Sequence, residues 1–455
     1  MIVGGKNYVV MNDLRKIKVG LVSLGCDKNR VDSEKLLAKM SEEFEITSDI
    51  MKADVLVINS CAFLTASRKE ALDAVFEYAE LKKVGKLKKI ILAGCLPQKF
   101  IGELFDELVE VDAFLGTFDG TMINEAVRRA LAGERCNFVG KGEELGCERV
   151  LTTPEHYAYL KISDGCSNHC TYCLIPKIRG ALRSRPVEEL VKETKLLGDV
   201  EELVLVAQDV TRYGEDIYGR PQTVRLIKEL TALENVRRVR LLYCYPELMT
   251  DELINELKTN EKLVKYVDMP LQHASDRILK LMNRKGTGKG YLELIKKLRK
   301  EVKGIALRST FIAGFPTETE EDFDILVDFL KKAELNNAGF FAYSKEPDTA
   351  AYKLKGHLTQ SIKNARVKKL YAVQREISAQ LNRKYVGKEI IVVADGIDYD
   401  RQEFFGRTYF HAPDVDGKVY LTGDGLIEQG KTYLVKVTAS DDYDLYGTII
   451  KEITQ

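Results

Sequence analysis

DGCSNHCTYC, residues 164–173, places three cysteines directly after an apolar run at residues 158–163. The run predicts a buried strand, so the loop with Cys166, Cys170 and Cys173 lies at its carboxyl end. Ordinary ferredoxin clusters and structural zinc sites take four protein ligands. Three thiolates around an iron–sulfur cube leave one iron open to a reactant. A zinc loop with His169 as fourth ligand is less favoured. His169 and Cys170 are adjacent in the sequence, whereas two ligands of one zinc ion normally have other residues between them.

Five more strand candidates follow this loop, with helical stretches between them. They span residues 203–208, 238–243, 266–269, 306–313 and 338–342. With residues 158–163 they predict six βα units, which form a complete or open barrel whose active site lies at the carboxyl ends of the strands. Pro186 at a first helical position, Thr250 as an N-cap and Thr317-x-x-Glu320 as a capping box mark the expected helix starts.

A second set of three cysteines lies upstream, and each of them ends an apolar run. Cys26, Cys61 and Cys95 follow KVGLVSLG, DVLVINS and KIILAG, at spacings of 35 and 34 residues. Such a repeat predicts parallel βαβ units, whose right-handed crossovers bring the strand carboxyl ends to one crevice. We therefore expect the three thiols to converge there. The alternative, buried thiols that merely cap strands, needs the same coincidence three times.

The last hundred residues change in charge and in pattern. Residues 355–388 predict a helix with an apolar face, nine Lys or Arg and a net charge of +8. This helix either packs on the barrel with a solvated charged face or offers a patch for RNA. From Tyr385 onward, five short alternating runs predict a small antiparallel barrel. That segment holds seven basic and thirteen acidic side chains, a net charge of −6.

Composition bounds the class of protein. A chain of 455 residues is too long for one core, and we place domains at 17–135, 152–383 and 384–455. The 69 basic and 69 acidic side chains balance, which argues against a general nucleic-acid binder. Without a signal-peptide pattern or a membrane-length apolar run, a cytosolic location is expected, where nine cysteines favour metal ligands or buried thiols over disulfides. Whether residues 1–16 are ordered, or Met11 is the true start, stays open.

The motifs carry a family resemblance. C-x3-C-x2-C with Tyr172 before the third cysteine resembles the radical S-adenosylmethionine superfamily. DGCSNHCTYCLIPKIRGALRSRP, with SLGCDKN, NSC and AGC upstream, is similar to the methylthiotransferases, and CLIPKIRG and LRSRP resemble the RimO type. The final segment resembles a TRAM domain, which often binds RNA. Ala181 stands where the family pattern has proline and Thr317 where it has glycine, and neither departure touches a cysteine.

The resemblance implies a fold, cofactors and partners. It implies an N-terminal parallel α/β domain, a central radical-SAM (βα)6 partial barrel and a C-terminal TRAM-like β-barrel. Two 4Fe-4S clusters would be held, one by Cys166, Cys170 and Cys173, which would bind S-adenosylmethionine, and one by Cys26, Cys61 and Cys95, which would carry the transferred sulfur. The substrate implied is an aspartate of small-subunit ribosomal protein twelve. An electron donor such as flavodoxin or ferredoxin and a sulfur source would also be needed.

The implied chemistry agrees with the target carbon. One-electron cleavage of S-adenosylmethionine would give a 5′-deoxyadenosyl radical, which would remove hydrogen from the aspartate β-carbon. That carbon has no proton acidic enough for a general base near neutral pH, so a radical route is reasonable.

Several other residues are candidates for contacts with S-adenosylmethionine. Tyr172 is suited to packing a flat ligand, and Gln208 and Asp209 end the second strand of the barrel. Arg308 and Gly314 are assigned to the end of a later strand, where an arginine offsets a carboxylate and a glycine lets the ligand approach the backbone. For each, an ordinary loop or strand-end role is the alternative. Three cysteines lack partners at ligand spacing and are expected to be structural: Cys136, Cys147 and Cys244.

Two rival functions are weighed against methylthiolation of the ribosomal protein. Methylthiolation of a tRNA adenosine, as in MiaB-type relatives, is disfavoured because an acidic last domain repels phosphate and attracts a lysine-rich protein. An iron–sulfur scaffold or electron carrier is disfavoured because it would take four ligands per cluster.

Overall fold

The computed structural model describes residues 17–423 and 425–453, which form two compact units. The first comprises the described residues up to Thr152 together with Lys177–Arg179, and the second comprises Thr153–Pro176 and the chain from Gly180 onward. The question about residues 1–16 and Met11 lies outside the described residues. The boundaries of three domains stay predictions, since the second unit contains both the central sheet and the C-terminal barrel.

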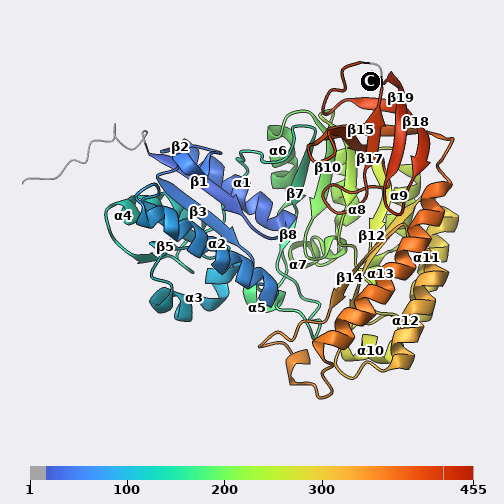
Figure 1. Cartoon of the computed structure of the whole chain (residues 1–455), viewed down its shortest axis with the longest axis horizontal. Helices are drawn as coiled ribbons and strands as arrows, with labels where there is room; N and C mark the ends of the chain where they lie inside the picture. Colours follow the sequence, from blue (N-terminus) through green and yellow to red (C-terminus); the bar gives the residue numbers. More distant parts are fainter. Residues whose placement is uncertain (1–16, 424, 454–455) are drawn as a thin grey trace, which may run out of the picture. The chain divides into compact units, whose positions relative to one another are not determined.

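The first unit is a parallel sheet covered by helices, with strand order β2-β1-β3-β4-β5-β6 (Figure 1). The strands are β1 (Lys18–Ser23), β2 (Glu45–Ile46), β3 (Val55–Ser60), β4 (Lys89–Gly94), β5 (Ala113–Phe114) and β6 (Cys136–Asn137). The helices are α1 (Asp27–Ser41), α2 (Thr65–Lys83), α3 (Cys95–Glu107) and α4 (Ile123–Leu131), with short turns η2 (Ile50–Lys52) and η3 (Gly120–Met122). Every residue of β3 is buried, as expected of a central parallel strand with both faces covered. The predicted parallel α/β fold is confirmed.

Strand register decides where the upstream cysteines lie. Ser23 pairs with Asn59, and Ser60 pairs with Gly94, so β1, β3 and β4 end at nearly the same level. The chain then turns sharply at Gly94, whose φ of 94° is readily adopted by glycine and rarely by other residues. A Cβ at Gly94 would collide with the side chain of Asn59. The turn therefore requires glycine immediately before Cys95.

The second unit contains an open six-stranded parallel sheet, ordered β14-β13-β12-β11-β10-β7. Its strands are β7 (Tyr157–Lys161), β10 (Val200–Val206), β11 (Val236–Leu241), β12 (Leu263–Asp268), β13 (Ala306–Ala313) and β14 (Asn337–Ala342). Between and after them lie α6 (Val187–Leu196), α7 (Glu215–Tyr218), α8 (Thr223–Thr231), α9 (Asp251–Thr259), α10 (Asp276–Leu281), α11 (Gly288–Glu301), α12 (Glu320–Ala333), α13 (Gln360–Arg383), η4 (Val210–Arg212), η5 (Pro246–Leu248) and η6 (Ala351–Lys353). A short helix, α5 (Ile175–Ile178), follows the cysteine loop, and β8 (Ser163–Asp164) pairs with β9 (Arg183–Ser184) around it. The predicted partial barrel is confirmed in its open form.

Helix starts test the local sequence predictions. Thr250 caps α9 as predicted, because its side chain accepts a hydrogen bond from Leu253 N. Pro186 is the N-cap of α6 and not its first helical residue, since its ψ of 144° is extended. The capping box of α12 is formed by Thr319 and Asp322, so the prediction at Thr317 and Glu320 was wrong by two residues. Thr317 has a φ of 67°, which keeps it outside the helix.

The C-terminal segment forms a closed antiparallel-rich barrel in the order β15-β16-β17-β19-β18. Its strands are β15 (Glu389–Asp398), β16 (Glu403–Arg407), β17 (Val419–Thr422), β18 (Thr432–Ser440) and β19 (Leu445–Glu452). It packs on the parallel sheet of the same unit through buried ion pairs, in which Glu202 of β10 binds both Arg240 and Arg407. Burial opposes ionisation of Glu202, yet the two arginines lower its pKa to about 2. The barrel is therefore fixed to the sheet by charge as well as by packing.

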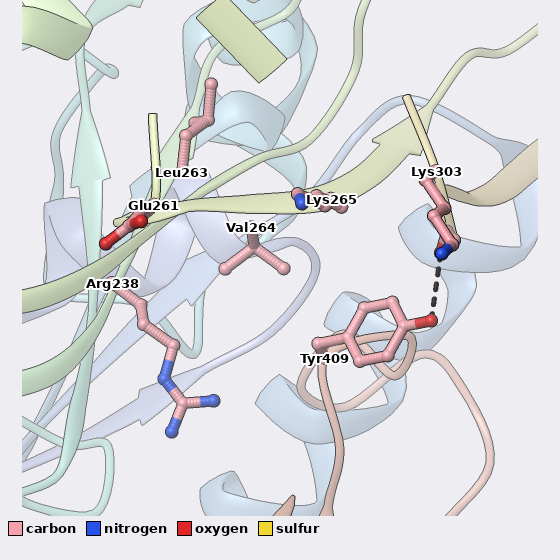
Figure 2. Close-up of a pocket in the computed structure, with 8 residues that line it drawn as sticks. Arg238, Glu261, Leu263, Val264, Lys265, Lys303 and Tyr409 are labelled. Atoms are coloured by element: carbon pink, nitrogen blue, oxygen red, sulfur yellow. Dashed lines mark hydrogen bonds between the residues drawn. The ribbon is translucent and has the colours of Figure 1, made fainter. Parts of the chain in front are cut away.

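A cavity of about 350 Å³ lies beside this contact (Figure 2). Its lining residues are Arg238, Glu261, Leu263, Val264, Lys265, Lys303, Gly304 and Tyr409. Most of them precede or begin β12 and β13, so the cavity lies at the amino-terminal ends of the strands. The cysteine loop follows the carboxyl end of β7, and the cavity is therefore separate from the candidate site.

Helix α13 runs beside α12 and β14 (Figure 1). Two of its predicted surface cations are buried: Lys363 donates to Tyr343 O, and Arg366 pairs with Glu318. This agrees with the interpretation of α13 as a helix packed on the barrel. Within the part of the chain that the structure describes, no helix is long and apolar enough to cross a membrane.

Candidate functional site

The first cysteine centre is assembled by the sheet of the first unit. Cys26 is the N-cap of α1, Cys61 follows β3, and Cys95 opens α3. The sulfurs of Cys26 and Cys95 lie 3.8 and 4.0 Å from one atom, Asn29 Oδ1. A Cβ on Gly25 would lie 2.8 Å from the Cβ of Cys61, which places Cys61 against the turn that carries Cys26. The structure therefore brings the three predicted cysteines together.

Asn29 holds this arrangement and was missed as a functional residue by the sequence analysis. It is 1% exposed, and its amide nitrogen donates to Leu24 O and Ser60 O, which ties the two cysteine turns to each other. Asn59 in turn donates to the backbone oxygen of Asn29. The signal was available, because Asn29 lies in the SLGCDKN motif three residues after Cys26.

Burial sets the protonation of these thiols. It raises the pKa of Cys95 to about 11, and it also raises the pKa of Cys61. In the absence of iron both are neutral thiols near pH 7, since an ordinary cysteine titrates at about 8.5. Binding of a cluster must therefore displace protons.

The second centre is one loop, fixed by hydrogen bonds to its surroundings. The backbone of Thr171 donates to Met282 O and accepts from Ala351 N, at 3.1 and 2.8 Å. His169 has a left-handed φ of 52°, and Asn283 donates to its carbonyl oxygen. The amides of Cys166 and Cys173 donate to Gly180 O and Cys170 O. These contacts fold the loop so that all three thiols share one region, which the positions alone did not guarantee.

Arg284 is a second residue that the sequence analysis missed. It is 7% exposed, its Nη1 lies 4.0 Å from the Sγ of Cys170, and its guanidinium stacks 3.9 Å from the ring centroid of Tyr245. Burial raises the pKa values of Cys166 and Cys173 to about 11 and about 12. Arg212 opposes that effect at Cys166, whereas Arg284 places its positive charge beside Cys170. No spacing rule links Arg284 to the cysteines, because 114 residues separate it from Cys170.

The donor sets suit a cluster better than a single ion. Among residues 17–423 and 425–453, no group of three His, Cys, Asp or Glu side chains is arranged around one ion position. A cube takes each thiolate on a different iron, so its ligands need not meet at one point.

The other predicted residues have different surroundings. Tyr172 packs against an apolar cluster that includes Met282 and Phe315. Gln208 donates to Asp164, and its Oε1 is buried with no hydrogen-bond partner among the described residues. That orphan acceptor fits a bound ligand that donates. Asp209 accepts hydrogen bonds from the side chain of Asn168 and from the backbone of Thr211, and the second of these caps η4.

The structure corrects the predicted place of Arg308 in its strand and shows what Gly314 packs against. Arg308 is the third residue of β13 and not at its end, and its guanidinium pairs with Asp268 and with Asp416 of the C-terminal barrel. Gly314 has a φ of 76°, and a Cβ there would collide with Lys363 of α13. Close packing of a helix is therefore one reason for this glycine, and its contact with S-adenosylmethionine stays a prediction. Three remaining cysteines are buried, as befits the structural role expected of them: Cys136, Cys147 and Cys244.

Comparison with known proteins agrees with this organisation. Family models match the radical SAM superfamily at residues 160–330, an uncharacterized protein family, UPF0004, at residues 18–116, and the TRAM domain at residues 386–450. The radical S-adenosylmethionine methyltransferase TsrM of Kitasatospora setae has a TM-score of 0.53 at 13% identity, over 74% of this chain and 77% of that one. That likeness shows the fold alone.

Curated relatives are closer in sequence. The ribosomal protein uS12 methylthiotransferase RimO of Clostridium botulinum (strain Eklund 17B / Type B) is 43% identical over 446 residues, which are 96% of this chain and 99% of the relative. The protein of the same name from Lachnoclostridium phytofermentans is 43% identical over 438 residues, 95% of this chain and 100% of the relative.

The fold, the two cysteine centres and these matches define a radical S-adenosylmethionine methylthiotransferase. Within that class the chain belongs to the RimO family. Membership confirms the predicted enzyme class and its cofactors, two 4Fe-4S clusters and S-adenosylmethionine. Which residues hold them stays a prediction.

Proposed function

We propose that this protein transfers a methylthio group to the β-carbon of an aspartate in ribosomal protein uS12. The observation that carries the proposal is the 43% identity, over nearly the whole chain, to proteins named for that activity. The two cysteine centres supply its chemical basis, because each offers three thiols and leaves room for one more ligand on a cube.

We assign the ligands of one cluster to the loop and those of the other to the sheet. Cys166, Cys170 and Cys173 hold the cluster that binds S-adenosylmethionine, and Cys26, Cys61 and Cys95 hold the other. When bound, these groups supply radical formation and a carrier for sulfur, chemistry that no side chain provides. The protein positions and shields them: Arg284 places a positive charge beside Cys170, Tyr172 closes the apolar side of the loop, and Gln208 offers its orphan acceptor.

The acidic barrel supports a basic protein partner, but less strongly than its net charge suggests. Asp395 and Asp416 are buried against the parallel sheet, where they pair with Arg407 and Arg308. Asp441 accepts backbone hydrogen bonds within the turn before β19, and Asp444 accepts one from Lys418 N, so reversing their charge would also break these contacts. Asp400 and Glu428 are exposed and better suited to a charge-reversal test of substrate binding.

The remaining partners follow from the same chemistry. An electron donor such as flavodoxin or ferredoxin must supply single electrons, and a sulfur source must replace the sulfur that is transferred. A ribosomal protein substrate places the reaction in the cytoplasm.

Mass spectrometry of ribosomal proteins and of tRNA, from cells with and without this chain, tests the proposal. We expect a mass gain of one methylthio group on one aspartate-containing peptide of uS12, present only with the chain. The same gain on a tRNA adenosine, with uS12 unchanged, would replace this function with the MiaB-type one.

A further inference from the structure

Three residues of the loop after Cys173 belong to the first compact unit. Lys177–Arg179 lie with the N-terminal sheet, whereas Pro176 and Gly180 on either side belong to the second unit. Lys177 is exposed, but Arg179 is 2% exposed. A buried guanidinium is costly unless anionic or carbonyl groups surround it, so this position needs an explanation.

Arg179 reaches the cysteine centre built by the sheet. Its Nη2 donates to Asn29 Oδ1 at 2.7 Å and pairs with Asp32 Oδ2 at 3.0 Å. Asn29 Oδ1 is the same atom that lies 3.8 Å from the sulfur of Cys26 and 4.0 Å from that of Cys95. The guanidinium of Arg179 therefore shares one acceptor, Asn29 Oδ1, with two of the three sulfurs.

The hydrogen-bond roles change when the thiols lose their protons. In the metal-free protein Asn29 Oδ1 can accept from a thiol as well as from Arg179. A cysteine bound to iron has no S–H to donate, so Arg179 then becomes the donor that keeps the amide oxygen satisfied and oriented. The net charge of a cluster and the hydrogen bonds and charges around its sulfurs set its reduction potential. A buried cation at this distance favours the more negative, reduced state of a cluster, and the carboxylate of Asp32 lies on the same guanidinium nitrogen.

We propose that Arg179 is a positioning residue of the N-terminal cluster, which orients Asn29 against the sulfurs and supplies positive charge that raises the reduction potential of that cluster. The proposal rests on the proposed function, because it takes Cys26, Cys61 and Cys95 as ligands. It also means that the site built by the N-terminal sheet is incomplete without Arg179, a residue of the loop that follows the other cysteine set.

The test uses the full chain with Cys166, Cys170 and Cys173 changed to Ala, so that only the N-terminal cluster contributes. Iron and sulfide content and a redox titration followed by electron paramagnetic resonance are measured for this parent and for three variants of it. Arg179→Gln removes the charge, Arg179→Lys keeps it, and Lys177→Gln removes a neighbouring exposed charge as the matched control.

At a fixed potential, Arg179→Gln is expected to lower the ratio of reduced to oxidised cluster at least tenfold, equal to about 59 mV for one electron. Arg179→Lys and Lys177→Gln are expected to stay within threefold of the parent. A cluster lost in Arg179→Gln but kept in Arg179→Lys also supports the proposal. An intact cluster with an unchanged ratio in Arg179→Gln, or loss of the cluster in both Arg179 variants, overturns it. A parent that binds no cluster instead overturns the ligand assignment on which it rests.

Discussion

The two cysteine centres of this molecule are built in opposite ways. Cys26, Cys61 and Cys95 come from the ends of three parallel strands, and the register of the sheet brings them together. Cys166, Cys170 and Cys173 share one loop, whose shape depends on hydrogen bonds to α10 and η6. A site built by a sheet inherits its geometry from the fold. A site built by a loop has to be held by its neighbours.

The two centres also share one device. Each has a buried arginine close to its sulfurs, Arg179 in the first and Arg284 in the second. Neither arginine could be chosen from spacing, because each approaches cysteines far away in the sequence. The common feature suits two sites that both concentrate negative charge when loaded with a cluster.

The largest expected effect separates the two centres by their chemistry. Changing Cys166, Cys170 and Cys173 to Ala should remove about half of the iron and all production of 5′-deoxyadenosine, because we assign to this loop the cluster that cleaves S-adenosylmethionine. Changing Cys26, Cys61 and Cys95 should also remove about half of the iron but leave cleavage in place while abolishing methylthio transfer. Iron analysis and chromatography of 5′-deoxyadenosine check both. Unchanged cleavage in the first variant would refute the assignment.

Arg284 tests whether the loop depends on its arginine. Arg284→Gln removes the charge beside Cys170 and leaves Tyr245 and Pro270 O without their partner. We expect cleavage of S-adenosylmethionine to slow at least tenfold, a cost of about 1.4 kcal/mol in the barrier. Lys285→Gln, one residue further and exposed, is the matched control. Equal rates of 5′-deoxyadenosine formation in the two variants would show that the guanidinium has no role there.

Gly94 tests how rigid the sheet-built centre is. Gly94 has a φ of 94°, and the Cβ added by Gly94→Ala collides with the side chain of Asn59. The hydrogen-bonded strands β3 and β4 cannot shift to relieve the collision. We expect a loss of about 3 kcal/mol in the free energy of unfolding of the first unit, measured by urea denaturation. Gly133→Ala, with a φ of 88° and no atom within 4 Å of the new Cβ, should cost only about 1 kcal/mol. In the loop-built centre, Gly165→Ala collides with Ala181 O, but we expect a smaller loss of stability because a loop can shift. Similar losses for Gly94→Ala and Gly133→Ala would contradict this account.

Acid should distinguish the two compact units. All five histidines lie after residue 152, and His411 is buried. Burial, together with Arg240 and Arg407, lowers its pKa to about 3. The unfolded chain therefore protonates His411 near pH 6.5, whereas the folded protein protonates it only near pH 3. The contribution of His411 to the free energy of unfolding is therefore present above pH 6.5 and is lost as the pH falls toward 3. Between pH 7.5 and 5.5 the second unit should lose about 1.4 kcal/mol.

Urea denaturation at the two pH values checks this loss, and hydrogen exchange assigns it to a unit. His411→Gln should remove the pH dependence, and peptides of the first unit should exchange alike at both pH values after correction for the intrinsic rate. Asp416 acts in the opposite direction: burial raises its pKa, so its contribution makes the protein more stable as the pH falls. That effect belongs to the pH range in which carboxyl groups titrate, below the range of histidine. A pH dependence that persists in His411→Gln would show that another group carries it.

Residues whose role is set by the backbone were predictable. Strands that each end in cysteine predict that Cys26, Cys61 and Cys95 lie together, and the C-x3-C-x2-C spacing places the other three in one loop, while the role of all six as cluster ligands stays a prediction. Residues whose role depends on a partner far along the chain were not. Arg308 was read as a strand-end residue, but its partners are Asp268 and Asp416, and Asp416 belongs to a barrel whose docking no local pattern reports. For the same reason the net charge overstates how acidic the surface of that barrel is, because Asp416 is buried in the contact with the sheet.

Thr317 gives the smallest expected effect and tests the support of the loop-built centre. It has a φ of 67°, strained for a β-branched residue, at the position where the family pattern has glycine. Its hydroxyl and carbonyl accept hydrogen bonds from Arg277 of α10, the helix whose end holds the cysteine loop. Thr317→Gly should relieve the backbone strain and keep the hydrogen bond from Arg277 to the carbonyl oxygen. It loses the hydrogen bond to the hydroxyl, however, and it raises the conformational entropy of the unfolded chain. The net gain expected in the free energy of unfolding is about 0.5 kcal/mol, measured by urea denaturation, with the cleavage rate unchanged. Glu334→Gly relieves the same kind of strain at the end of α12, where φ is 45°, and serves as the control. If Thr317→Gly destabilised the protein while Glu334→Gly stabilised it, the hydroxyl bond to Arg277 would outweigh the strain, and the loop-built centre would depend on this side chain as well.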